Sequence, residues 1–292
     1  MSSDAWGDLT NSLTAVCDQF SQDRQIYEGF LTGSPAALEV VGEPYADDWG
    51  PRPSRNANMA GLLLTLVAVD HLACLAALLR PQSRVIYGPS AEARSAMEVA
   101  ARGYHLLDPE ITPLERICRQ QNERLVSLSE GKRLAVLLKQ PQESINVLDN
   151  RTKAIFDSAR NHGLTPHPKA NPHPYIGSKP PSATKLIDEA VGQPKGLGET
   201  YYKVMSAVAH GREHGITQYF TYQGALLDPT HADAFGSIET TPKMTAQYLS
   251  GTPRAMANIL DRLYDRFGWP GAAIQPALTR MRATWDRIAT ST

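Results

Sequence analysis

Apolar side chains recur every three or four residues along most of this chain, which is the spacing of an amphipathic α-helix. Alternating patterns typical of β-strands are nearly absent, and no internal repeat is visible. The pattern predicts an all-α protein, with residues 1–292 forming a single multi-helix, bundle-like domain of about seven to nine helices. The first helix is expected over residues 5–31, with these core positions: Leu9, Leu13, Val16, Phe20 and Ile26.

Glycine and proline divide the rest of the pattern into elements. Residues 33–55 have the composition of a loop, and Met59–Leu79 is expected to form the second helix. Between residues 163 and 198 the composition shifts to proline and glycine, which predicts a linker or lid loop with a short helix around Leu186. Further helices are expected at about 90–107, 113–138, 143–160, 200–222, 240–268 and 275–289.

The segment Met59–Leu79 is apolar enough and long enough to cross a bilayer. Asp70 and His71 lie near its middle, where ionisable groups would be costly in lipid, so a core helix is the favoured interpretation. The N-terminus carries Asp4 and Asp8 where a signal peptide would carry basic residues. We therefore expect a cytoplasmic protein with no membrane contact.

Composition and charge agree with that expectation. Apolar residues make up 42% of the chain, which fits a globular protein, and the formal net charge is −1. No global basic field draws this protein to nucleic acid, although a local patch is still compatible with the composition. The three cysteines are far apart, which favours a reducing compartment over a disulfide framework.

The predicted helix at 90–107 carries polar residues along the edge of its apolar face. Arg94, Glu98 and His105 form this polar stripe, and Glu98 and His105 are two helical turns apart. Such a stripe can line a pocket, or it can be a solvated boundary. The apolar face itself comprises Ala93, Ala96, Met97, Ala100, Tyr104 and Leu107.

The predicted helix at 200–222 is unusual in another way. Arg212 projects into the middle of its apolar face, where a guanidinium needs a carboxylate or an anionic ligand as its partner. Two glycines lie along the helix, which suggests that another backbone or a ligand approaches closely. The small-residue ridge is Ala207, Gly211 and Gly215, and the polar residues on another side are Ser206, His210, His214 and Thr217.

These two helices predict a small-molecule site where they face each other. Arg94, Arg212, His214 and Ser206 are the candidate ligand-binding residues. Glu98, His105 and His210 are the candidate catalytic residues, since histidine titrates near neutrality. A purely structural Arg–Glu–His network that fixes helix register explains the same residues equally well. The sequence does not identify a cofactor, and a homodimer is compatible with it.

A metal-dependent oxidase is an alternative for the same residues. Glu98, His105, His210 and His214 have spacings that place ligands on common helix faces, as in helical di-iron proteins. A complete di-iron set needs more carboxylates, and Asp70 and Glu213 are the only convenient additions.

The stretches EARSAMEVAARGYHLLDP and YYKVMSAVAHGREHG support a second alternative. They resemble a loose group of mostly uncharacterised, often actinobacterial helical proteins, and the second stretch is distantly similar to abortive-infection and HEPN-type domains. The resemblance implies a helical module in nucleic-acid-linked defence or stress, with Arg94, Glu98, Ser206 and His210 at the family-like positions. HEPN-type ribonucleases have Arg, four to six residues, then His. Here the nearest equivalent is Lys203 followed by His210, so RNA cleavage is the part of the resemblance that this sequence departs from.

Overall fold

A computed structural model describes residues 4–80, 85–217, 220–221, 237–238 and 240–291. The predicted all-α class is confirmed, since the described residues form 13 helices and only four two-residue strands. This is more than the seven to nine helices expected, because α2 (Pro35–Glu39), α3 (Ala46–Trp49) and α10 (Glu213–Ile216) are short helices that apolar periodicity does not reveal. In addition, the helix expected at 240–268 is two helices, which end and begin on either side of Ser250.

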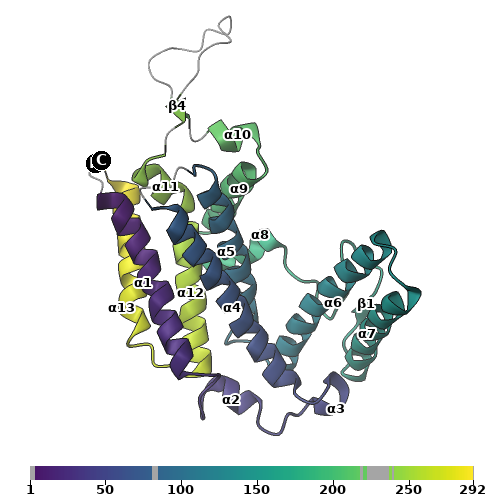
Figure 1. Ribbon diagram of the computed structural model, residues 1–292. Coiled ribbons are helices and arrows are strands. Elements are labelled where there is room, and N and C mark those ends of the chain that lie inside the picture. The colour runs from purple at the N-terminus through teal and green to yellow at the C-terminus, as the bar shows by residue number, and fades with distance from the viewer. Residues whose placement is uncertain (1–3, 81–84, 218–219, 222–236, 239, 292) are drawn as a thin grey trace, which may run out of the picture.

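Most of the long helices pack into one bundle around the larger of two apolar cores (Figure 1). The core draws its largest fully buried side chains from α1 and the C-terminal helices, among them Phe20, Tyr264, Phe267 and Trp285. The bundle consists of α1 (Asp4–Ile26), α4 (Pro53–Leu78), α5 (Gly88–Leu106), α8 (Ala183–Val191), α9 (Leu197–Ala209), α11 (Pro242–Leu249), α12 (Gly251–Phe267) and α13 (Ile274–Thr290).

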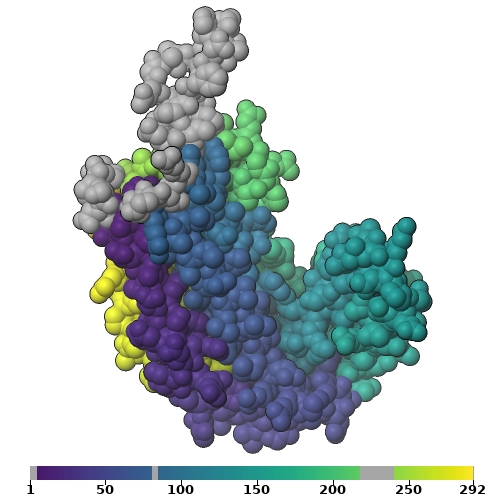
Figure 2. Space-filling model, in the orientation of Figure 1, coloured from purple at the N-terminus to yellow at the C-terminus, as the bar shows by residue number. Residues whose placement is uncertain are grey.

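Two helices leave the bundle as an antiparallel arm, α6 (Pro113–Leu137) and α7 (Gln142–Asn161) (Figure 1). The arm has a core of its own, in which Ile117 and Leu125 of α6 pack with Ile155 and Phe156 of α7. In space-filling view a notch separates the arm from the bundle (Figure 2). The molecule therefore offers a recess between two packed units as well as the interhelical contacts that the sequence predicts.

A buried cluster of charges fastens the arm to the bundle. Glu39 of α2 lies 3.2 Å from the Nε of Arg116 on α6 and also contacts the guanidinium of Arg266 on α12. The amide of Asn58 on α4 donates to Glu39 at 3.1 Å and accepts from Arg266 Nε at 2.9 Å. The Glu39 carboxylate of α2 is thus contacted by side chains from α4, α6 and α12. Both arginine side chains are almost completely buried.

The proline-rich segment is ordered along the arm. Its strands β1 (Pro166–His167) and β2 (Tyr175–Ile176) pair in antiparallel fashion, and β2 packs on α6. The short helix predicted around Leu186 is confirmed as α8. A second two-stranded pair, β3 (Phe220–Thr221) and β4 (Ser237–Ile238), lies beyond α10.

The helix expected over residues 200–222 is wrong in its C-terminal half. α9 ends at Ala209, and Gly211 adopts a positive φ of 63°, a conformation that terminates helices. Arg212 then sits at the exposed N-cap of α10 and not inside an apolar face, so the predicted small-residue ridge does not form. Only Gly215 makes the expected close approach, because a Cβ there would lie 2.5 Å from the Val208 nitrogen. Residues 218, 219 and 222 lie outside the described ranges.

Two further predictions about helices have mixed outcomes. α1 ends five residues earlier than expected, and Ile26 is 67% exposed and not in the core, whereas Leu9, Leu13, Val16 and Phe20 are buried as predicted. α4 is the one described helix that is long and apolar enough to cross a membrane. This is weak evidence for a membrane span, since core helices pass the same test, and α4 packs against α1, α5, α6 and α12.

Candidate functional site

The structure brings together three of the predicted site residues where α5 meets α9. Arg94 forms an ion pair with Glu98 at 2.8 Å, and its Nη1 lies 3.4 Å from Nε2 of His210. The guanidinium also donates to the Tyr202 hydroxyl at 3.3 Å and lies over that ring. Burial alone would lower the pKa of Arg94, but the contacts with Tyr202 and Glu98 outweigh it and raise the pKa. Arg94 therefore stays charged.

The other predicted residues of the second helix do not join this cluster. Arg212 and His214 are exposed on and before α10, past the break at Gly211. Ser206 is half-buried on α9, and its carbonyl accepts the His210 amide at 3.0 Å. The sequence pattern treats residues 200–222 as one straight helix, which places these side chains on shared faces that the break removes.

His105 lies apart from Glu98, at the far end of α5, and it faces the arm. Its Nδ1 is 3.1 Å from Nη1 of Arg119, and the same nitrogen of Arg119 donates to the His105 carbonyl at 2.7 Å. Burial, with a further contribution from the Arg119 charge, lowers the pKa of His105 to about 4. The ring is thus neutral at pH 7. Because Nδ1 must accept from a guanidinium that can only donate, the proton resides on Nε2.

A groove of about 700 Å³ begins at His105. One wall is the first three turns of α6, from Thr112 to Glu123, and the other is the proline-rich segment, at residues 163–167 and 177–181. Leu186 of α8 contributes to the same wall, and β1 runs beside α6 and α7 (Figure 1). The proline-rich segment, which is expected to be a linker or a lid loop, thus forms one wall of an opening at α6 and not between α5 and α9.

The walls of the groove are held together by side chains of α6. Asn122 accepts from the Ile176 amide at 2.8 Å and donates to the Ile176 carbonyl at 3.2 Å, so one side chain contacts both backbone groups of this residue in β2. Cys118 also contacts that carbonyl, and burial raises the pKa of its thiol to about 11, which keeps it protonated. Gly177 has a positive φ of 64°, and a Cβ there would lie 3.2 Å from the sulfur of Cys118. These contacts within the protein hold both walls in place, so the groove is preformed.

The charges that line the groove balance. Arg119 is fixed by Asp108 at 3.3 Å and by Glu115 at 2.6 Å, so its guanidinium is oriented without a ligand. Lys179 is an exposed cation on the opposite wall, and Glu123 and Glu115 are the acidic residues of the lining. The lining thus carries two cations and two carboxylates beside the neutral His105, and Glu123 is also paired with Arg102 of α5. Such a surface suits a ligand that has both an anionic group and hydrogen-bond donors.

A second cavity of about 290 Å³ lies on the other side of His105. Its lining includes Asp108 and Glu189, with Arg262 stacked on the Tyr104 ring and donating to the Tyr104 carbonyl at 2.6 Å. His105 is therefore the shared wall of two neighbouring cavities.

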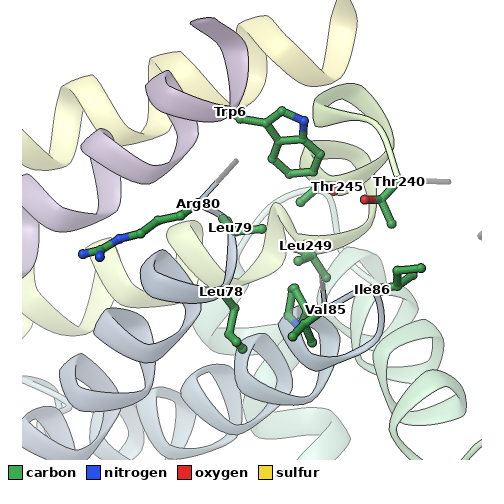
Figure 3. Close-up of a pocket in the computed structure, with 10 residues that line it drawn as sticks. Trp6, Leu78, Leu79, Arg80, Val85, Ile86, Thr240, Thr245 and Leu249 are labelled. Carbon is green, nitrogen blue, oxygen red and sulfur yellow. The ribbon is translucent and has the colours of Figure 1, made fainter. Parts of the chain in front are cut away.

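A third cavity, of about 200 Å³, lies at the opposite end of the bundle, near the start of α1 (Figure 3). It combines apolar side chains, such as Trp6 and Leu249, with the hydroxyls of Thr240 and Thr245, and Arg80 points away from it. Neither this cavity nor the two near His105 is lined by Arg94, Glu98 or His210.

The residues proposed for a metal centre are dispersed. Glu98 and His105 are engaged with different partners at different places on α5, and His214 lies beyond the helix break. Over residues 4–80, 85–217 and the described part of the C-terminal region, no three His, Cys, Asp or Glu side chains gather in a way that could hold a metal ion.

Comparison with known proteins yields no relative: no protein-family model, curated protein or solved structure matches this chain. The resemblance to HEPN-type domains therefore stays a prediction.

Sequence reasoning missed the residues that build the groove, namely Arg119, Asn122 and Lys179. The spacing of Glu115 and Arg119 by four residues is a visible signal of an ion pair on one helix face. No pattern in the sequence, however, connects α6 with His105 or with β2, since these contacts join segments that only the tertiary fold brings together.

Proposed function

We propose that this protein binds a small, polar, net-neutral molecule carrying one anionic group in the groove between α6 and the proline-rich segment. The observation that supports the proposal most strongly is the oriented pair of Arg119 and His105 at the head of a preformed groove of about 700 Å³. This volume lies in the range of sites for small molecules. A zwitterion such as an amino acid or a short peptide fits the balanced charges.

Each lining residue has a distinct part in this proposal. Lys179 receives the anionic group, because it is an exposed cation on the wall opposite α6 and has three rotatable donors. The Nε2–H of His105 donates to an oxygen of the ligand. Glu123 or Glu115 accepts from the amino group through the lone pairs that its ion pair with an arginine leaves open. His105 acts as a donor and not as a general base, because its low pKa leaves it a weak base near neutrality.

We further propose that the protein acts in the cytoplasm. Its three cysteines are all unpaired thiols in the structure, and two of them are buried, which suits a reducing compartment.

Native mass spectrometry of the purified full chain tests the proposal without assuming a ligand. Thermal-shift and calorimetric titrations with amino acids and dipeptides then measure how tightly these molecules bind. Ser178→Trp places a large ring in the groove from an exposed position and should abolish binding while leaving the melting temperature unchanged. Lys179→Ala should weaken binding at least tenfold, whereas Lys169→Ala, at an exposed lysine of the same segment that does not line the groove, should not. A ligand whose affinity survives Ser178→Trp lies elsewhere, and the proposal is then wrong.

A second candidate function rests on the Arg94–His210 contact. An exposed histidine next to a guanidinium and the Tyr202 hydroxyl is suited to acid–base chemistry on a phosphodiester, as the HEPN-like resemblance implies. RNA degradation by the wild type that disappears in His210→Ala and persists in His214→Ala would support this candidate. Degradation that survives His210→Ala would exclude His210 from the reaction.

A further inference from the structure

The outer side of α4 carries a row of exposed or half-exposed residues at positions 60, 63, 67, 70 and 74. The intervals alternate between three and four residues, which is the spacing of a helix seam that packs against another helix. Leu63 is 60% exposed and Val67 is 39% exposed, although α4 is the most apolar helix of the described residues. We call this row, which consists of Ala60, Leu63, Val67, Asp70 and Cys74, the α4 seam.

The α4 seam is part of a broad, accessible surface. α4 forms a long stretch of the face seen in Figure 2, between α1 and the arm. Beside Leu63 the surface is hollowed by a depression of about 140 Å³, which is shared with α6 and reaches Arg124. A helix of the length of α4 extends over about 39 Å at 1.5 Å per residue, enough for an interface of ordinary size when α5 and α6 flank it.

Charges are distributed unequally along this surface. At the Leu63 end, Arg102 is paired with Glu123, while Arg124 is exposed and its described contact is with the amide oxygen of Gln121 at 3.4 Å. At the other end Asp70 is exposed on the seam, and Glu92 of α5 faces His71 at 2.9 Å. The surface therefore has a basic end and an acidic end, with apolar side chains between them.

We propose that the α4 seam is a self-association surface on which a second copy of this chain packs antiparallel, about a two-fold axis near Val67. An isologous interface places each end of the surface against the opposite end of the partner. The antiparallel arrangement thus brings Arg124 of one copy toward Asp70 and Glu92 of the other, and Leu63 toward the turn that contains His71. Ala60 of one copy faces Cys74 of the other. Parallel packing would instead oppose like charges.

The acidic residue in the seam also distinguishes a protein partner from a lipid surface. Asp70 lies within the exposed row, between Val67 and Cys74, where insertion into a bilayer would bury a carboxylate without a counter-charge. In the proposed dimer, Arg124 of the second copy supplies that counter-charge. The second copy, and not a membrane, then covers the exposed apolar side chains of the row.

Sedimentation velocity of the full chain tests the proposal. The wild type should sediment as a dimer at micromolar concentration. Val67→Arg should shift it to a monomer with an unchanged circular dichroism spectrum, whereas Leu137→Arg, at a more exposed apolar position on the arm, should leave the dimer intact. Asp70→Arg and Arg124→Asp should each weaken dimerisation at least tenfold, and the double variant should recover most of the loss.

Cross-linking provides a check that does not depend on the stability of a charge variant. Ala60→Cys should give a disulfide-linked dimer through the native Cys74 of the other copy on mild oxidation, and adding Cys74→Ser should remove that product, since Cys17 and Cys118 are buried. A monomeric wild type at all concentrations would overturn the proposal, as would a dimer that is indifferent to Val67→Arg. Flotation of the wild type with vesicles of phosphatidylcholine and phosphatidylglycerol would overturn it in favour of a membrane.

Discussion

Replacing Glu39 with Gln removes the one carboxylate that two buried arginines share. The side chains of Arg116 and Arg266 are 1% and 7% exposed, and Glu39 itself is 11% exposed. Removing one partner of a buried ion pair costs about 3–5 kcal/mol, because the remaining charge stays buried without compensation. Arg116 keeps the Asp108 carbonyl at 2.8 Å and Arg266 keeps Asn58, so we expect a value at the lower end, about 3 kcal/mol.

Urea denaturation at pH 7, followed by circular dichroism, measures this change in the free energy of unfolding. Glu28→Gln is the matched control, since Glu28 is exposed, and it should change stability by less than about 0.5 kcal/mol. The double variant Glu39→Gln/Arg266→Met should lose less than the sum of its single variants, because it removes one of the stranded charges. A loss below about 1 kcal/mol for Glu39→Gln would refute the view that this cluster fastens the arm to the bundle.

The lowered pKa of Glu39 also makes the free energy of unfolding depend on pH. Burial by itself would raise the pKa of Glu39, but Arg116, Asn58 and Arg266 together lower it from 4.5. Its contribution is therefore complete above pH 4.5 and is lost as the pH falls through the lowered value. The Gln variant should lose this part of the acid dependence.

Three further changes test other parts of the structure. Asn122→Ala leaves the buried Ile176 amide unpaired and leaves the Ile176 carbonyl with only the weak thiol donor of Cys118, so it should cost about 1–3 kcal/mol by urea denaturation, together with loss of ligand binding. His105→Gln should reduce the fall in stability between pH 6.5 and 4, because the lowered pKa of His105 makes the unfolded chain bind the proton more tightly in that window. Gly215→Ala should lower the melting temperature, since its Cβ would meet the backbone of α9, whereas Gly7→Ala, in an open helical position, should raise it slightly.

The helices were largely predictable because the apolar residues of each helix recur at the helical spacing within its own short stretch of sequence. Of the apolar positions predicted for α5 and its C-cap, Ala93, Ala96, Met97, Ala100 and Leu107 are buried and Tyr104 is half-buried. The Arg94–Glu98 pair follows from the spacing of these two residues. The helix at 200–222 shows where this reasoning fails. The residues around Gly211 keep a helical pattern of apolar positions, yet glycine stops a helix at little cost, and Gly215 packs against α9 only after the chain has turned.

The groove was not predictable in the same way. Its construction depends on Asn122 reaching β2 and on Arg119 reaching His105, and these contacts join residues that are 54 and 14 positions apart. Helical periodicity describes each face separately and does not say which faces meet. His105 was identified from its sequence, but its neutral state arises from burial beside Arg119, which only the packing of α6 on the end of α5 creates.

Chemical-shift mapping by NMR on the full chain, during titration with the ligand found by native mass spectrometry, locates the binding site most directly. We predict that the perturbed amides cluster at residues 112–123 and 177–181, with the side-chain amide of Asn122 and the ring of His105 among them. Perturbations that centre on Arg94, Tyr202 and His210 while the groove is unaffected would contradict the proposal and place the site where α5 meets α9.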